Sequence, residues 1–285
     1  MQKITAMICG MASTVFFSIC VQASHVPYIG TYSIEPSIDG NITSLHVKDN
    51  IINIPVGGVC TWLWYSPQRP DTCTTTYHLE AVPNSGGHDH HDDQRPLGSI
   101  MINGQSTDTY TYYSTSDAAH DLEYTAATFS GSIRLISTHC SGGRPCFNEV
   151  HLIQVGVPNL AMLPDSIEYV KIGSTGVSSL HSGNHFANRT MLSYIQMLAN
   201  EWIFLNPVLP VLKINDISLI KGGHFDINNN WRGPHKQHIF GNDVDIAYVG
   251  ILNERRFRSL AKKLAGSNYR WDGVHGNHHH ISLHR

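Results

Sequence analysis

Positive charge is scarce in this 285-residue sequence. Nineteen Lys and Arg stand against 22 Asp and Glu, the formal net charge is −3, and only 14% of the residues are charged. Surfaces that bind nucleic acids or anionic membranes need clustered positive charge, so the sequence predicts neither partner. The residue type that needs an explanation is histidine, of which there are 19.

Long apolar runs are missing beyond the N-terminus, so no membrane span is predicted. Residues 1–23 have the pattern of a cleaved secretory signal peptide. Lys3 provides the positive charge, the stretch from Ile8 to Val21 is mostly apolar, and Val21-Gln22-Ala23 is an A-x-A-like cleavage site. We therefore expect a secreted or periplasmic protein.

Cysteine spacings of the C-x2-C type, which indicate structural zinc sites, are absent. Four cysteines follow the predicted signal peptide: Cys60, Cys73, Cys140 and Cys146. An even number in an exported chain indicates disulfide bonds. Of the three pairings that four cysteines allow, the short loops favour Cys60–Cys73 with Cys140–Cys146.

Residues 24–160 contain neither a convincing long helix nor an internal repeat. They are rich in Thr, Ser, Tyr, Val and Ile, in short alternating runs separated by Gly, Pro, Asn, Asp and Ser clusters. Short strands at regular spacing indicate an antiparallel sandwich. The sequence therefore predicts an all-β, sandwich-like domain over 24–160.

Residues 161–285 have a different pattern. Apolar residues at helical spacing predict one helix within 188–205 and another over 254–264. Alternating apolar residues predict three strands, at 211–219, 243–252 and 278–284. This order predicts an α+β domain, a small antiparallel sheet flanked by helices.

Two histidines and a carboxylate in this second domain suggest a metal site. His238 and Asp245 are seven residues apart, and His280 lies in the terminal run His278-His279-His280. Strand alternation places Asp245 on a face opposite to its apolar neighbours, and likewise puts His278 and His280 together on a polar face. If the two strands pair, Asp245 and His280 become neighbours within reach of one ion. Three protein ligands leave a position for water, as in catalytic zinc sites.

The combination H-x6-D followed by H-x-H resembles the signature of the zinc peptidases grouped around lysostaphin, D-alanyl-D-alanine peptidases and hedgehog. With Gly241 between the His and the Asp and a strand DVDI, it is most similar to penicillin-insensitive murein endopeptidase and D-alanyl-D-alanine carboxypeptidase-like proteins. The resemblance covers residues 211–285. It implies an α+β metallopeptidase domain with one Zn²⁺ per chain held by His238, Asp245 and His280, and His278 as a catalytic histidine that is not a ligand.

Further residues have weaker assignments. His235 matches a second histidine of some relatives, and Asp243 is the candidate partner for the outer ring nitrogen of a ligand histidine. Arg232 could hold a substrate carboxylate or simply face solvent. Trp231 could stack on a substrate or anchor its loop. No Glu-x-x-His motif is present, so His278 must serve as the base.

A glycine-flanked loop near residue 90 carries His88, His90 and His91. Such His-rich tracts can capture zinc or copper, or can form a polar hairpin loop that binds nothing tightly. An exported zinc scavenger that uses this loop is a further alternative.

Together these patterns and the resemblance predict an exported zinc metallopeptidase. The resemblance implies a hydrolase of the cell wall that cleaves peptide bonds in peptidoglycan stem peptides or cross-links. The alternative is a secreted metal-binding or adhesion module with a non-catalytic, hedgehog-like zinc site.

Overall fold

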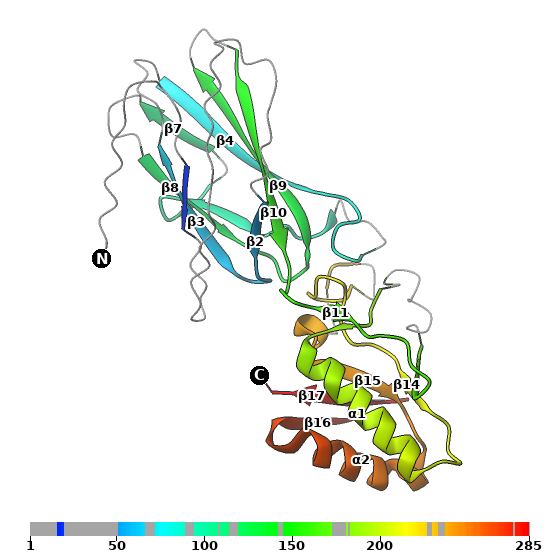
Figure 1. Ribbon diagram of the computed structural model, residues 1–285. Helices are drawn as coiled ribbons and strands as arrows, with labels where there is room; N and C mark the ends of the chain where they lie inside the picture. Colours follow the sequence, from blue (N-terminus) through cyan, green and yellow to red (C-terminus); the bar gives the residue numbers. More distant parts are fainter. Residues whose placement is uncertain are drawn as a thin grey trace.

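The structure of the protein is a computed structural model, drawn in Figure 1. It describes the following residues: 16–19, 51–65, 72–88, 94–107, 109–113, 119–141, 145–172, 181, 183–226, 230–232, 237–275 and 277–284. Of the predicted signal peptide, only the short strand β1 (Phe16–Ile19) lies among them. Figure 1 shows two parts, with β2–β4 and β7–β10 at the top and α1, α2 and β14–β17 at the bottom.

The first part, here called the β unit, contains two five-stranded sheets. One has the strand order β1-β3-β8-β5-β6 and the other β2-β10-β9-β4-β7. The strands after β1 are β2 (Ile51–Ile54), β3 (Val59–Tyr65), β4 (Thr72–Ala81), β5 (Ser99–Ile102), β6 (Gln105–Ser106), β7 (Thr109–Tyr113), β8 (Ala119–Thr125), β9 (Gly131–Ser141) and β10 (Phe147–Val155).

Alternation in the strand sequences explains how this unit is held together. Along β9, Ile133 and Leu135 are buried whereas Arg134 between them is exposed. These side chains join a buried apolar cluster with residues of β2, β5, β8 and β10, so one core serves both sheets. Each large side chain buried in such a core contributes about 1.5–3 kcal/mol to folding.

The second part, here called the C-terminal unit, is built on a five-stranded sheet of order β12-β14-β15-β17-β16. Its strands are β12 (Tyr169–Lys171), β14 (Leu212–Ile214), β15 (Asp243–Ala247), β16 (Tyr269–His275) and β17 (His278–Leu283). A separate two-stranded sheet pairs β11 (Ala161–Met162) with β13 (Phe186–Ala187).

Two helices, α1 (Arg189–Leu205) and α2 (Ile251–Ala265), pack on one face of the large sheet. α1 begins at Asn188, whose side chain accepts a hydrogen bond from the backbone N–H of Met191. Its buried stripe includes Leu198 and Trp202, which share a core with Ile246 of β15. The apolar face of the sheet is thereby covered, and the opposite face keeps its polar side chains.

The predicted fold class was wrong. In the residues that the structure describes, strands outweigh helices and form four sheets, and an α+β peptidase domain of the predicted kind is not found there. The C-terminal sheet is mixed, because β12 and β14 run parallel with α1 in the connection between them. It also contains β16, which the sequence pattern did not predict. The predicted strand 243–252 was too long, because residues 251–252 begin α2.

One predicted disulfide lies within the described residues: Cys140 is bonded to Cys146. Cys60 is also disulfide-bonded. The side chain of Cys73, its predicted partner, lies outside the described residues. In the part of the chain that the structure describes, no helix is both long and apolar enough to cross a membrane.

The two units meet where the loop after β14 packs on the connection between β8 and β9. Ser130 Oγ donates to the carbonyl of Gly222 over 2.6 Å, and His224 N donates to the carbonyl of Thr128 over 2.9 Å. Gly223 has φ +82°, and a Cβ there would lie 2.7 Å from Ser130 N. The approach of the two backbones at this junction therefore requires glycine.

Candidate metal centre

The candidate metal centre starts from the pairing of β15 with β17. Asp245 lies directly opposite His280, and His280 Nδ1 is 2.7 Å from Asp245 Oδ1. The neighbours Val244, Ile246 and Ile281 are fully buried against the helices. Because side chains alternate along a strand, burying these apolar residues turns Asp245 and His280 to the other face.

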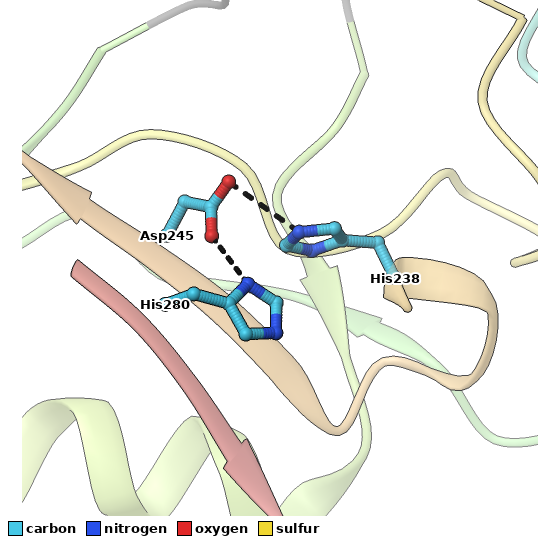
Figure 2. A group of neighbouring side chains, drawn as sticks. All are labelled: His238, Asp245 and His280. Atoms are coloured by element: carbon cyan, nitrogen blue, oxygen red, sulfur yellow. Dashed lines mark hydrogen bonds and ion pairs between the residues drawn. The ribbon is translucent and has the colours of Figure 1, made fainter. Parts of the chain in front are cut away.

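His238 comes from a short 3-10 helix, His238–Phe240, that ends at Gly241. Gly241 has φ +66°, and a Cβ there would lie 3.0 Å from Ala187 Cα, so the turn requires glycine. Nδ1–H of His238 donates to the carbonyl of Ile217 over 2.8 Å, which leaves Nε2 facing Asp245 Oδ2 at 3.4 Å. Figure 2 shows one carboxylate oxygen of Asp245 joined to each of the two imidazoles.

His238, Asp245 and His280 form a group that could hold a metal ion. Each offers one ligand atom, these atoms lie within 4.8 Å of one another, and all three residues are buried. Two imidazole nitrogens and a carboxylate oxygen form a donor set suited to zinc and its neighbours. Within the described residues, this is the one group of three or more His, Cys, Asp or Glu that meets this geometry.

The outer nitrogen of His280 has partners of its own. Its Nε2 lies 3.5 Å from Asp243 Oδ1 and 3.3 Å from Ser282 Oγ, and Ser282 Oγ in turn donates to Asp243. Such contacts fix the ring orientation of a ligand histidine. The carbonyl of Ile217 plays this part for His238.

The other two histidines of the terminal run lie in different surroundings. His278 Nε2 is 3.3 Å from Asp245 Oδ2, and the His278 side chain is 20% exposed. His279 points to the helix side, where it packs on Phe257 and Tyr248, and burial lowers its pKa to about 4. Of the two, only His278 is both close to the group and open to solvent.

The electrostatics of the group couple the carboxylate of Asp245 to the histidines around it. Burial opposes ionisation of Asp245, but His238, His280 and His278 together hold the pKa of its carboxyl well below its usual range. Burial also opposes the charged form of His280, yet Asp243 and Asp245 raise its pKa to about 9. Burial likewise lowers the pKa of His238 and Asp245 raises it, and the net result is a raised pKa.

Two residues that we did not single out adjoin the centre, Asp216 and its neighbour Asn184. Burial raises the pKa of Asp216 to about 6, with His238 and Asp245 among the charges acting on it. Its carboxylate accepts hydrogen bonds from the side chains of Asn184 and Asn215. Its backbone carbonyl accepts from Asp245 N over 2.8 Å. The sequence feature that could have identified Asp216 is its position as an acidic residue within the predicted strand 211–219.

The remaining predicted residues are dispersed. Arg232 is exposed, and its N–H donates to Asn230 Oδ1. Trp231 has φ +55° and packs edge-on against Phe129 of the β unit, with ring centroids 5.3 Å apart. His88 is buried at the junction of the two units. His235, His90 and His91 lie outside the described residues.

Comparisons with known proteins gave matches among solved structures alone. No family model matches the chain, and no curated protein matches it. A C. elegans MSP family member matches at 7% identity and TM-score 0.24, covering 38% of this chain and 93% of its own. The periplasmic chaperone SfaE matches at 8% and 0.26, with 44% and 62% covered. A PapD-like domain of human CEP192 matches at 10% and 0.26, with 45% and 97% covered. None of these names indicates a zinc peptidase, and TM-scores this low transfer no function to this chain.

Proposed function

We propose that this protein is an exported zinc-dependent peptidase that acts on peptidoglycan stem peptides or cross-links. The observation that carries the proposal is the place of His278, partly exposed and 3.3 Å from Asp245 beside three converging ligand atoms. A metal group meant only for structure needs no solvent-accessible histidine next to it. The substrate class comes from the family resemblance described above, and the export comes from the predicted signal peptide.

The residues that would hold zinc are His238 through Nε2, His280 through Nδ1 and Asp245 through a carboxylate oxygen. When bound, zinc lowers the pKa of a water and polarises the scissile carbonyl. Ile217 and Asp243 keep the outer ring nitrogens engaged, so the two ligand histidines present fixed nitrogens.

His278 would perform the proton transfers of amide hydrolysis. It accepts a proton as water adds to the carbonyl carbon, and returns a proton to the amine nitrogen as the C–N bond breaks. Its Nδ1 lies 3.4 Å from Asn277 Oδ1, which leaves Nε2 on the side of Asp245. An imidazole can both accept and donate a proton, as the two steps require.

The test is digestion of purified peptidoglycan by the wild type and by His278→Ala, with the products identified by mass spectrometry. We expect cleaved stem peptides from the wild type and at least about 100-fold less from His278→Ala, because acid–base catalysis contributes that much. His284→Ala is the matched control, since His284 is an exposed histidine just after the same strand.

Metal content must be measured on the same samples. His278→Ala should keep its zinc, so that loss of cleavage reports on proton transfer. If the wild type carries zinc but releases no more stem peptide than His278→Ala does, the peptidase proposal is overturned and a metal-binding or adhesion module is favoured.

A further inference from the structure

A second pair of histidines meets at the junction of the two units. His88 lies in the connection between β4 and β5, and His181 lies before β13 in the C-terminal unit. His88 Nδ1 is 3.3 Å from His181 Nε2, and the two rings are nearly perpendicular, at 80°. Residues 93 positions apart in sequence thus bring two ring nitrogens into direct contact.

Both imidazoles are withdrawn from water, since His88 is 0% and His181 2% exposed. Their neighbours are largely aromatic. Trp231 lies 5.1 Å and Phe129 6.1 Å from the His88 ring, and Phe225 lies 5.6 Å from the His181 ring, between ring centroids. The pair is therefore enclosed on the sides where these aromatic rings lie.

The distance between the two nitrogens fits a shared metal ion. Ligand nitrogens at about 2.0–2.1 Å from a tetrahedral ion are about 3.3–3.4 Å apart. The same 3.3 Å is also a hydrogen-bond distance, so one ring donates N–H to the other when no ion is bound. An ion at this place would replace the shared proton.

We propose that His88 and His181 are two ligands of a second divalent transition-metal ion, bound between the β unit and the C-terminal unit. Imidazole nitrogens suit zinc and copper(II), and the general affinity order places copper(II) above zinc. Water or a further side chain would complete the coordination. This site shares no ligand with the first centre, and it does not depend on the peptidase proposal.

The ion would join the two units, because each supplies one ligand. Loss of either histidine should therefore remove the ion and also weaken the junction. The first centre differs in this respect, since His238, Asp245 and His280 all belong to the C-terminal unit.

The test is metal stoichiometry on the full chain, loaded with Zn²⁺ or Cu²⁺, desalted and analysed by mass spectrometry. We expect two ions per chain in the wild type and one in each of His88→Ala, His181→Ala and His238→Ala. His224→Ala is the matched control, because His224 packs on Phe129 in the same cluster but is not in the pair. This control should keep two ions.

A spectroscopic measurement covers the case in which a variant folds poorly. Asp245→Ala, which disables the first centre, is loaded with one equivalent of Cu²⁺ and examined by electron paramagnetic resonance. Hyperfine coupling to two imidazole nitrogens is expected, and it should vanish when His181→Ala is added. One ion in the wild type that only His238→Ala removes would overturn the second site and leave the first intact. Equal loss in His224→Ala would also overturn it.

Discussion

The Nδ1–H of His238 donates to the backbone carbonyl of Ile217 over 2.8 Å. This one bond selects the tautomer, because the ring nitrogen that carries hydrogen cannot also bind a metal. The nitrogen left over, Nε2, is the one that faces Asp245. Backbone geometry beside β14 therefore decides which atom of His238 serves the centre.

Removing the carboxylate should abolish tight metal binding at this centre. In Asp245→Ala, we expect the affinity for Zn²⁺ to fall more than about 100-fold, since changing even a supporting residue costs about 10- to 100-fold. Competition with a chromogenic chelator measures this. Both proteins carry His88→Ala, so that the proposed second site does not contribute. If Asp245→Ala then binds Zn²⁺ as tightly as the protein that keeps Asp245, the assignment of the first centre is wrong.

The contacts of the outer nitrogen of His280 give a graded prediction. Asp243→Asn and Ser282→Ala should each weaken Zn²⁺ binding by about 10- to 100-fold without abolishing it, because they leave all three ligands in place. The same chelator competition measures the loss. Asp121→Asn, at an exposed position of β8, is the control and should have no effect. Unchanged affinity in both variants would show that Asp243 does not support His280.

The junction glycine should be intolerant of a side chain. Gly223→Ala places a Cβ 2.7 Å from Ser130 N and 3.0 Å from Thr128 O, in a backbone conformation that L-residues avoid. We expect a loss of more than about 2 kcal/mol in the free energy of unfolding, measured in urea. Gly104→Ala, at φ +76° with no atom within 4 Å, isolates the conformational cost and should lose about 1 kcal/mol. Equal losses in the two variants would contradict the close packing at the junction.

Glu149 in β10 should make stability depend on pH. Burial raises its pKa from 4.5 to about 7, so folding favours the protonated carboxyl. The stabilisation is complete below pH 4.5 and is lost as the pH rises through 7. Compared with Glu149→Gln, the wild type should lose about 1–3 kcal/mol of unfolding free energy between about pH 4.5 and 8, measured by urea denaturation. Glu80→Gln, at a side chain that is 44% exposed, is the control. A parallel pH profile for wild type and Glu149→Gln would refute the shift.

The metal group could be predicted from the sequence because it rests on local alternation. In β15 and β17, apolar residues must face the helices, so Asp245 and His280 are forced to the other face whatever the rest of the fold does. The strand order of the C-terminal sheet could not be predicted in this way. Parallel pairing of β12 with β14 depends on how α1 crosses over, and strand patterns do not encode that choice.

The histidine pair at the junction was equally hidden. His88 belongs to a polar, glycine-flanked run that predicts a surface loop, and His181 carries no periodic pattern around it. Only the packing of the two units brings them to 3.3 Å. Likewise, β16 escaped prediction because Gly273 and a register shift beside it interrupt the alternation that identifies a strand.

The backbone of the ligand helix is tied to the junction. Gly223 N donates to the carbonyl of Ile239, the residue after His238, over 2.9 Å, and the same glycine packs on Ser130. Occupancy of the centre and docking of the β unit are therefore linked equilibria. By thermodynamic reciprocity, the factor by which the ion shifts the docking equilibrium equals the factor by which docking raises the affinity for the ion. Removing the ion from the C-terminal unit with a chelator would then change the stability of its contact with the β unit, through that single glycine.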